Sequence, residues 1–522
     1  MGEAQSEGLK TRIVMLVTND VIQDSRVKKE AHALVREGFE VLIAGVASSS
    51  VTPGQNVVDG LQVVHFDVKK IGTKLERRDF GLYRKVHLIL RIMFAPFILL
   101  AAGIGKIFSA PIWIESGLRA KRVLGSIWVA FSSRARHFLL ITVGKLLGSK
   151  ALFRFFRNVW RRARSRVRKM RLDVRGVWRE LNLINRMLKF WARLVRLFGV
   201  ARFNRFLFSR LFARAARAEI ISWQPAVVHC HDFDTLLLGK GIAKRVNAKL
   251  VYDSHELWSG RNVPLPKSLP NRIMRRVELR QEKQALRAAG LVVTVSEGVR
   301  DHLTKIGADS QLVIVVKNIP EISVDASLLG RQRAVEEGTV YYSGRITTGR
   351  LLEELVDAVS SLGLPELSIN LLGYGPAAYI EGLKGYAARQ GVCLTVHAPV
   401  ASSEVPSRLG SAEVVFVGVE PLVESYRLSL PNKFFEAALS GRPVVIPQLP
   451  EIVRESHSLR GFHVMEDFSS QGISEAIKRA RTSAFDAHSA LEERVTRFSW
   501  VREVEGLVAG YRRILQDSRA AQ

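Results

Sequence analysis

The segment SLPNKFFEAALSGRPVV, residues 429–445, brings together side chains that could bind an anion. Asn432, Lys433 and Glu436 fall in the first turns of a helix that the pattern predicts from Pro431 onward. The first amides of a helix have no partner within it and attract negative groups. Asn432 and Glu436 are four residues apart and share a helical face. These residues predict a phosphate site, although the same pattern also suits an ordinary amphipathic surface helix.

Two glycine-containing turns carry further candidates in the same half of the chain. Gly344 and Arg345 follow the strand-like run VYYS, and Arg350 begins the next helical segment. Two guanidinium groups at the end of a strand could bind a diphosphate, because their planar forks match its oxygens. Gly373 and Gly375 follow the next strand-like run and predict a tight turn.

In the other half, the segment DSHE places His255 between carboxylates directly after a strand-like run. A single histidine usually has a structural role, but the end of a strand favours a functional one. The segment HCHD, residues 229–232, contains possible metal ligands. Alternate residues of a strand point to opposite faces, and no second group of ligands accompanies this one. We therefore expect no metal site.

The elements that hold these residues alternate between strand and helix. Apolar runs at 12–18, 41–44 and 62–66 predict strands, and residues 24–37 have the spacing of a helix. This order predicts a doubly wound parallel sheet. No glycine-rich loop joins the first strand to its helix, which disfavours a dehydrogenase.

The same alternation resumes near residue 226 and begins again near residue 339. The predicted fold class is therefore α/β, with two Rossmann-like domains facing a cleft and a basic, mainly helical insertion in the first. The predicted boundaries are an N-terminal domain at 10–317, an insertion within it at 72–218, a linker at 318–337, a C-terminal domain at 338–489, and a C-terminal helix at 490–518 that packs back across both domains.

The insertion carries almost all of the net charge of +29. Residues 71–220 contain 34 Lys and Arg but only 6 Asp and Glu, interleaved with Leu, Phe and Trp at helical spacing. This combination favours helices lying in a membrane interface over anionic lipid. A protein-facing helical insertion is the first alternative. Nucleic acid is disfavoured as a partner, because it would not require so many large apolar side chains.

Residues 92–105 form an apolar run that is shorter than the roughly 20 residues needed to span a bilayer. Whether residues 87–114 cross the membrane stays open. The N-terminus has no secretory pattern, and the two cysteines suggest no disulfide framework. We expect a cytoplasmic protein, peripheral or monotopic at the inner face of the cell membrane.

Seven segments in order resemble the family 4 (group 1) glycosyltransferases, which have the two-domain GT-B fold. They are DSRVKKEAHAL, VVHCHDFDTLL, VYDSHE, TVSEGV, VYYSGR with GR, LLGYGP and SLPNKFFEAALSGRPVV. The resemblance covers roughly residues 10–70 and 220–515 and leaves the insertion out. It implies an enzyme that moves a sugar from a nucleotide-diphosphate donor to an acceptor, in the synthesis of polysaccharide or glycolipid.

The resemblance also implies roles for single residues. Glu436 would accept hydrogen bonds from the ribose of the donor, Arg345 and Arg350 would neutralise the leaving diphosphate, and His255 would contact the transferred sugar. The implied catalytic residues are His255, Arg345, Arg350 and Lys433; the implied donor-nucleotide residues are Gly344, Gly373, Gly375, Asn432 and Glu436; and Asp24 with Arg26 would lie on the acceptor side.

Similar enzymes retain anomeric configuration without a metal ion, so the resemblance implies a nucleotide sugar as the donor substrate and no cofactor. The basic and aromatic insertion adds the expectation of a lipid-linked acceptor at the membrane surface. One position departs from the family pattern: many members have a second glutamate where this chain has Leu428. Without that glutamate, the resemblance does not say how this chain would contact the hydroxyls of the donor sugar. Two alternatives stay open: a sugar-nucleotide epimerase or hydrolase of the same fold, and a catalytically degenerate membrane scaffold.

Overall fold

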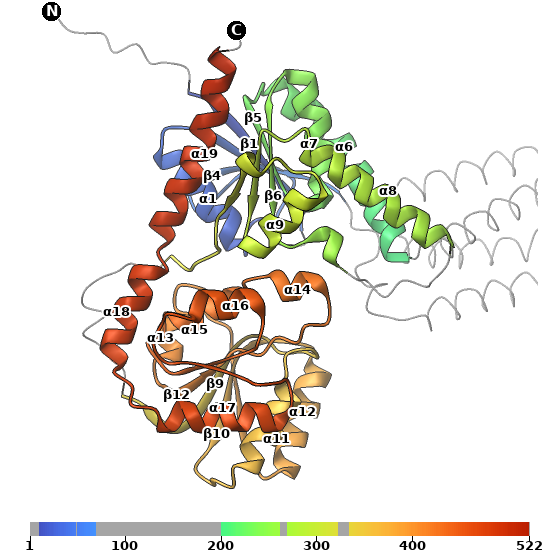
Figure 1. The fold of residues 1–522 in the computed structure, drawn as a ribbon. Helices are drawn as coiled ribbons and strands as arrows, with labels where there is room; N and C mark the ends of the chain where they lie inside the picture. Colours follow the sequence, from blue (N-terminus) through green and yellow to red (C-terminus); the bar gives the residue numbers. More distant parts are fainter. Residues whose placement is uncertain (1–9, 49, 69–199, 262–268, 322–333, 521–522) are drawn as a thin grey trace, which may run out of the picture. The chain divides into compact units, whose positions relative to one another are not determined.

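The computed structural model describes residues 10–48, 50–68, 200–261, 269–321 and 334–520 (Figure 1). The chain divides into two compact units, of which the first comprises residues 1–66, 214–265 and 275–522. Both β-sheets belong to this first unit. Most of the predicted insertion at 72–218 lies outside the described residues. None of the helices in the described ranges has both the length and the apolar character needed to cross a lipid bilayer.

The first sheet has eight strands in the order β3-β4-β2-β1-β5-β6-β7-β8. Seven of them pair in parallel, and β3 pairs antiparallel with β4 at the edge. The strands are β1 (Arg12–Leu16), β2 (Glu40–Val46), β3 (Gly54–Val58), β4 (Leu61–Phe66), β5 (Val227–His231), β6 (Lys249–Ser254), β7 (Leu291–Thr294) and β8 (Val313–Val315).

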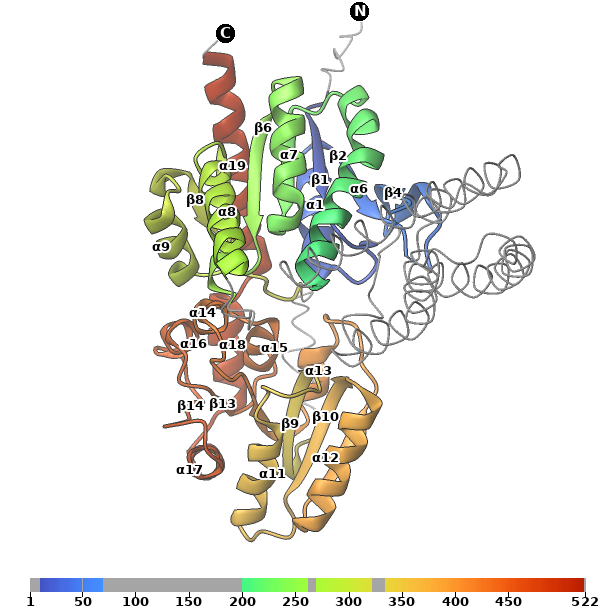
Figure 2. The ribbon, with the colours of Figure 1, turned by 90° about the vertical axis from the view of Figure 1, so that its right-hand side faces the viewer.

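Helices cover both faces of this sheet, which is why its strands are apolar on both sides (Figure 2). On one face, α1 (Ser25–Arg36) and α19 (Trp500–Ala520) pack against the alternate residues Ile13, Met15 and their neighbours. On the other face, α7 (Asp232–Val246) contacts β5 and β6. The remaining helices on this sheet are α6 (Val200–Ser222), α8 (Leu269–Leu286) and α9 (Glu297–Ile306).

The second sheet has six strands, all parallel, in the order β11-β10-β9-β12-β13-β14. They are β9 (Glu336–Arg345), β10 (Ser368–Tyr374), β11 (Cys393–His397), β12 (Ala412–Phe416), β13 (Val444–Ile446) and β14 (Phe462–Val464).

This sheet also has a separate core on each face. Val340 and Tyr342 of β9 face a core built with α11 (Leu352–Ser361), α12 (Ala377–Arg389) and α17 (Ser470–Thr482). Tyr341 faces the opposite core. That core is built with α13 (Val405–Leu409), α15 (Asn432–Ala438), α16 (Pro450–Ser456) and α18 (Ala487–Arg497), and α14 (Glu424–Leu428) lies beside α16.

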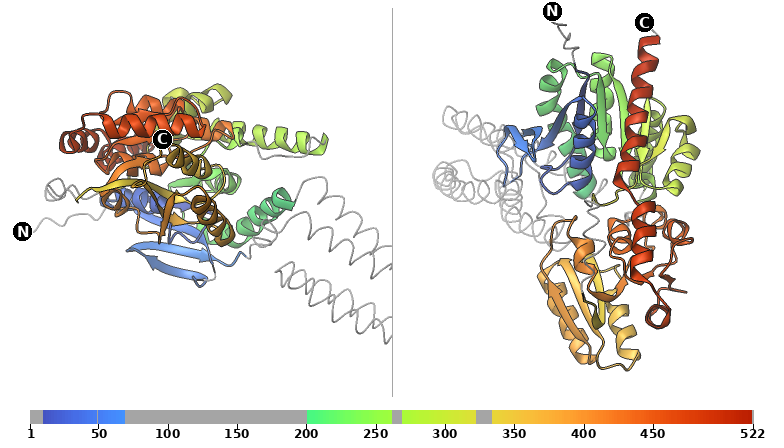
Figure 3. Two further views of the ribbon diagram at one scale, coloured as in Figure 1. Left: turned by 90° about the horizontal axis from the view of Figure 1, so that it is seen from below. Right: turned by 90° about the vertical axis from the view of Figure 1, so that its left-hand side faces the viewer.

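The predicted fold class, α/β with Rossmann-like parallel sheets, is confirmed. The single C-terminal helix predicted at 490–518 is instead two helices, α18 and α19, separated near Phe498. The break arises because the two halves pack on different cores: Phe498 joins the core around α15, and Trp500 joins the core of the first sheet. Figure 3 shows α19 lying along the first sheet. Strand β3 was not predicted.

Candidate functional site

The predicted glycines lie together at the carboxyl edge of the second sheet. The parallel pairing of β9 and β10 places Gly373 beside Gly344. A Cβ atom on Gly373 would stand 1.9 Å from the carbonyl oxygen of Gly344, and one on Gly375 would stand 1.9 Å from that of Ile346. Gly344 and Gly373 have φ angles of +124° and +154°, which L side chains rarely adopt. Only glycine allows the two strand ends to approach so closely.

Lys433 lies over this glycine turn from the first turn of α15. Its Nζ donates to the hydroxyl of Tyr342 at 2.6 Å and to the carbonyl oxygen of Gly418 at 3.4 Å. The ammonium group also stands 4.3 Å from the centre of the Tyr342 ring. Burial, and then the positive charge of Arg350, lower the pKa of Lys433 well below its ordinary value. An anion bound beside Lys433 would oppose this effect and favour the charged ammonium.

Glu436 lies one helical turn further along α15 and is 9% exposed. Its carboxylate accepts hydrogen bonds from the hydroxyls of Ser343 at 3.2 Å and Ser402 at 3.3 Å. Burial raises its pKa, and these two hydrogen bonds partly oppose that effect. A buried carboxylate held by two hydroxyl groups can accept the same hydrogen bonds from the hydroxyls of a sugar ring.

The two predicted arginines have different surroundings. Arg345 ends β9 with an exposed side chain, and its carbonyl oxygen accepts a hydrogen bond from Tyr342 at 2.9 Å. Arg350 stands 5.6 Å from the ring centre of Tyr426, and its charge acts on Lys433. The exposed side chain of Asn432 accepts a hydrogen bond from Asn318 at 2.9 Å.

His255 follows β6 in the first sheet and is held by carboxylates. Its Nε2 lies 2.8 Å from Asp253 Oδ2 and 3.0 Å from His231 Nδ1, and its Nδ1 lies 3.7 Å from Asp232 Oδ2. Burial alone would lower its pKa, but the negative charges of Asp253 and Asp232 outweigh burial and raise the pKa to about 9. The side chain keeps 19% of its surface exposed, so it is the accessible member of this group.

The two residues predicted on the acceptor side differ in exposure, because Arg26 is buried and Asp24 is half-buried at the start of α1. Arg26 is buried, with its guanidinium donating to Asp253 at 3.1 and 2.9 Å and to the carbonyl oxygen of Val316 at 2.8 Å. Asp24 caps helix α1 by accepting from the amide of Val27. Arg26 therefore fixes Asp253 instead of lying open toward an acceptor.

Several residues of the site were not predicted. Ser343 and Ser402 hold Glu436, Tyr342 holds Lys433, and His231 contacts His255. Ser343 stands next to a predicted glycine, and His231 lies within the HCHD segment. Both residues therefore lie beside motifs from which a place in the site could have been predicted. Ser402 could not have been predicted, because it lies in a loop without a recognisable pattern.

Residues 179–319 match the model of Glycosyltransferase Family 4. The match includes three of the seven segments that carry the resemblance: VVHCHDFDTLL, VYDSHE and TVSEGV. A sequence search found no curated protein with significant similarity.

Solved structures share the fold over almost the whole chain. A sucrose-phosphate synthase from Thermosynechococcus elongatus has a TM-score of 0.57 and 13% identity, and the alignment covers 97% of this chain and 100% of that one. HepE from Anabaena, in complex with UDP and glucose, has a TM-score of 0.54 and 12% identity, with 96% and 98% covered. A glycosyltransferase from Rickettsia africae has a TM-score of 0.52 and 11% identity, with 97% and 99% covered.

Proposed function

We infer that this chain, which carries a Glycosyltransferase Family 4 domain on a GT-B fold, is a glycosyltransferase that takes its sugar from a nucleotide-diphosphate donor. The observation that carries this inference is the buried carboxylate of Glu436 with the ammonium of Lys433 one turn away. Both lie at the carboxyl edge of a parallel sheet, where α/β proteins bind nucleotides.

Glu436 is the proposed ribose contact. In the described chain its two carboxylate oxygens accept one hydrogen bond each, from Ser343 and Ser402. The 2′- and 3′-hydroxyls of a ribose have the same chemistry and the same number of donors as these two hydroxyl groups. We propose that the ribose replaces or joins them when the donor binds.

Lys433, Arg345 and Arg350 are the proposed contacts of the diphosphate. Cleavage of the glycosidic bond of the donor leaves negative charge on the diphosphate, and cations placed beforehand stabilise that charge most effectively. The glycine turn at Gly344 and Gly373 has no side chains that would keep a phosphate from the backbone. In this proposal, basic side chains rather than a metal ion neutralise the leaving group.

His255 is the proposed contact of the transferred sugar, and Asp253 fixes its ring through the 2.8 Å hydrogen bond. The acceptor would bind on the side of the first sheet. We propose retention of the anomeric configuration, as the resemblance implies.

We further propose that the acceptor is lipid-linked and that the chain works in polysaccharide or glycolipid synthesis at the inner face of the cell membrane. The support is the composition of residues 72–218, in which basic and large apolar residues alternate. Such a segment would hold the enzyme on anionic lipid, where a lipid-linked acceptor is available.

The first experiment is a thermal-shift screen of nucleotide sugars, beginning with UDP-sugars because HepE, which shares the fold, was solved with UDP. A specific donor raises the melting temperature by mass action. We expect Glu436→Gln to weaken donor binding about 10- to 100-fold, since hydrogen bonds to a charged group contribute roughly 1.5–3 kcal/mol. Glu381→Gln, at an exposed position of α12, is the control and should bind the donor normally. Equal affinity in wild type and Glu436→Gln would contradict the assigned ribose contact.

A second experiment supplies the donor together with lipid-linked acceptors and follows the sugar. We expect transfer only when an acceptor is present, and an α-configured donor should give an α-configured product in the NMR spectrum. Rapid breakdown or epimerisation of the donor without acceptor would favour the epimerase or hydrolase instead. Binding of donors without any turnover would favour the scaffold.

A further inference from the structure

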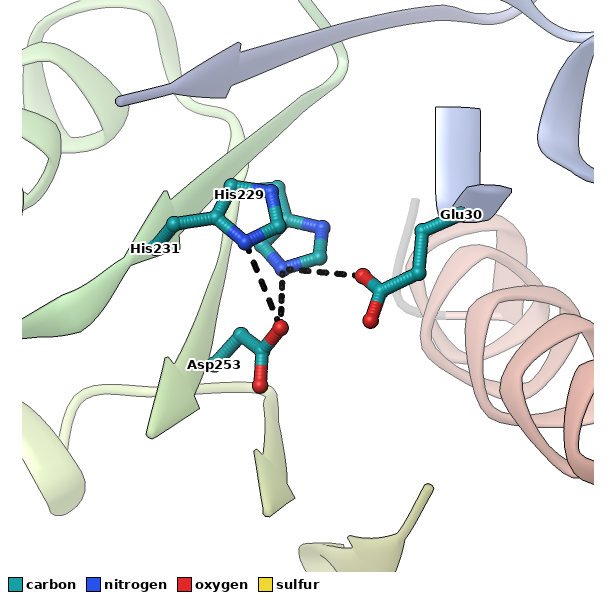
Figure 4. A group of neighbouring side chains, drawn as sticks. All are labelled: Glu30, His229, His231 and Asp253. Atoms are coloured by element: carbon teal, nitrogen blue, oxygen red, sulfur yellow. Dashed lines mark ion pairs between the residues drawn. The ribbon is translucent and has the colours of Figure 1, made fainter. Parts of the chain in front are cut away.

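Four buried side chains converge beneath the first sheet's carboxyl edge and form a group that the proposed transfer reaction does not use directly. They are Glu30 from α1, His229 and His231 from β5, and Asp253 from β6. Each offers one atom able to bind a metal ion, and these four atoms all lie within 4.8 Å of one another. Figure 4 shows the four side chains pointing toward one centre.

The backbone explains the convergence. His229 and His231 are two residues apart on one strand and therefore share a face. Their rings stack with centres 4.2 Å apart. The parallel pairing of β5 with β6 places Asp253 directly beside His231. Helix α1 covers the same face and adds Glu30.

Three of these side chains have a buried polar atom without a hydrogen bond: Glu30 at both oxygens, and His229 and His231 at Nε2. Glu30 Oε1 lies 3.0 Å from Arg26 Nε in an ion pair. Glu30 Oε2 faces His229 Nε2 at 3.9 Å, and that nitrogen lies 3.8 Å from Asp253 Oδ2. These distances are too long for hydrogen bonds, but they leave room for an atom between the groups.

We propose that Glu30, His229, His231 and Asp253 form a structural site for a divalent transition-metal ion of the Zn²⁺ class. Bonds of about 2.1 Å to four ligands give a tetrahedron with edges of about 3.4 Å. The 3.3 Å between His231 Nδ1 and Asp253 Oδ2 matches that edge, and the edges at 3.8 and 3.9 Å would shorten by a few tenths of an ångström on binding. His231 Nδ1 would exchange its 3.0 Å contact with His255 Nε2 for the ion, while Asp253 Oδ2 keeps its 2.8 Å hydrogen bond with His255. Two imidazoles with two carboxylates suit Zn²⁺ better than Mg²⁺ or Ca²⁺, which prefer oxygen ligands alone.

The surroundings of the site support a structural role. All four ligands are at most 3% exposed, so no open position faces a substrate. The hydroxyl of Tyr511, from α19, lies 2.5 Å from His229 Nδ1 and orients that ring. Arg26 pairs with both carboxylates and fixes them from the other side. The ion would thus join α1, β5 and β6, three segments far apart in the sequence.

The test measures bound metal in the untagged full-length protein. After incubation with Zn²⁺ and desalting, mass spectrometry of the metal content should give one zinc per wild-type chain. The variants Glu30→Gln and His229→Asn should lose at least 90% of it. His488→Asn, which removes an exposed histidine of α18, should bind as wild type does. Zinc should also raise the melting temperature of wild type but not that of Glu30→Gln.

The proposal is overturned if the folded wild-type protein binds less than a tenth of an equivalent. That result would mean that Arg26 and a proton neutralise the two carboxylates without an ion. Equal zinc in wild type and variants would likewise overturn it, because the metal would then be held elsewhere. If the variants do not fold, crystals of wild type soaked in Zn²⁺ decide the matter: an anomalous peak among these four residues supports the site, and its absence there excludes it.

Discussion

Lys433 and Glu436 lie in neighbouring positions of one helical turn, and burial shifts their pKa values in opposite directions. Burial lowers the pKa of the ammonium and raises that of the carboxylate, so it disfavours the charged form of each group. The hydroxyl groups of Ser343 and Ser402 already stabilise the charged form of Glu436, whereas Lys433 would gain an anionic partner only from the diphosphate of a ligand. Donor binding and protonation should therefore be linked.

Lys433 provides the first prediction at this scale. Because a diphosphate favours the protonated ammonium, binding of a nucleoside diphosphate should take up a proton, and the affinity should fall as pH rises through the lowered pKa. Calorimetry in two buffers with different ionisation enthalpies measures this uptake. Lys433→Arg should keep binding but lose its pH dependence, because arginine stays charged. A binding enthalpy that is the same in both buffers would contradict the linkage.

Glu282 in α8 provides the second prediction at the scale of residues, which concerns the stability of the fold. Burial raises its pKa from 4.5 to about 7, with Ser259 and Arg275 partly opposing. A raised carboxyl pKa lowers stability as pH rises through 4.5, and the loss is complete above 7. The difference corresponds to about 3 kcal/mol.

We expect Glu282→Gln to be more resistant to urea than wild type at pH 8 and nearly equal to it at pH 4. The midpoints of urea unfolding at the two pH values measure this. The exposed control Glu381→Gln should follow wild type at both. A wild-type midpoint that does not change between pH 5 and pH 8 would show that Glu282 is not held in its neutral form.

From the sequence, the positions of the reactive groups could be predicted better than the residues with which they form hydrogen bonds and ion pairs. Glu436 and Lys433 could be placed at the start of a helix because helical spacing and Pro431 are local signals. The burial of Arg26 and its pairing with Asp253 could not be predicted, since the partner comes from a strand more than two hundred positions later. For the same reason HCHD did not indicate the proposed metal site: Glu30 and Asp253 join the histidines only in the folded sheet.

At the scale of elements, the glycine turn between β9 and β10 is the most constrained feature of the second sheet. The prediction here compares two glycines. Gly373→Ala places a Cβ atom 1.9 Å from the backbone of Gly344 at a φ of +154°, so it should destabilise the chain by roughly 1–3 kcal/mol and reduce donor affinity.

Gly382→Ala is the matched control, because a Cβ atom there meets nothing within 4 Å and the residue lies inside α12. It should raise stability by about 0.5–1 kcal/mol. Urea unfolding and the donor thermal shift compare the two variants. Equal stability of Gly373→Ala and wild type would mean that the strand ends can separate at no cost.

Strands and helices with clear periodicity were predictable, and their order was enough to predict the parallel sheets. Helix α1 lies within one residue of its predicted ends at each side, because Asp24 caps it and Gly38 follows it. The break between α18 and α19 was not predictable from periodicity. The apolar stripe from Trp500 to Ile514 does not show where the preceding helix ends, and only the fold shows that Phe498 and Trp500 join different cores.

At the scale of the whole molecule, the last prediction is that residues 72–218 bind the chain to anionic membranes. If their basic and apolar residues bind anionic lipid, the full-length chain should sediment with vesicles containing phosphatidylglycerol and much less with vesicles of phosphatidylcholine alone. Binding should weaken as salt rises, because the Debye length shortens from about 10 Å at 0.1 M to about 3 Å at 1 M.

A chain in which residues 72–199 are replaced by a Gly/Ser linker keeps the described part of α6 and should not sediment with either kind of vesicle. Equal sedimentation of the shortened and full-length chains would place the lipid-binding surface elsewhere.

Helix α19 has a consequence for how the chain is made. Trp500, Leu507, Tyr511 and Ile514 complete the core that begins with Ile13. On the ribosome, the core around the first strand therefore stays incomplete until α19, almost five hundred residues later, has been synthesised. At about 5–20 residues per second this delay is roughly half a minute or longer. During that time β1 and its neighbours expose apolar surface, so a chain whose translation stops before α19 should depend on chaperones and be degraded early.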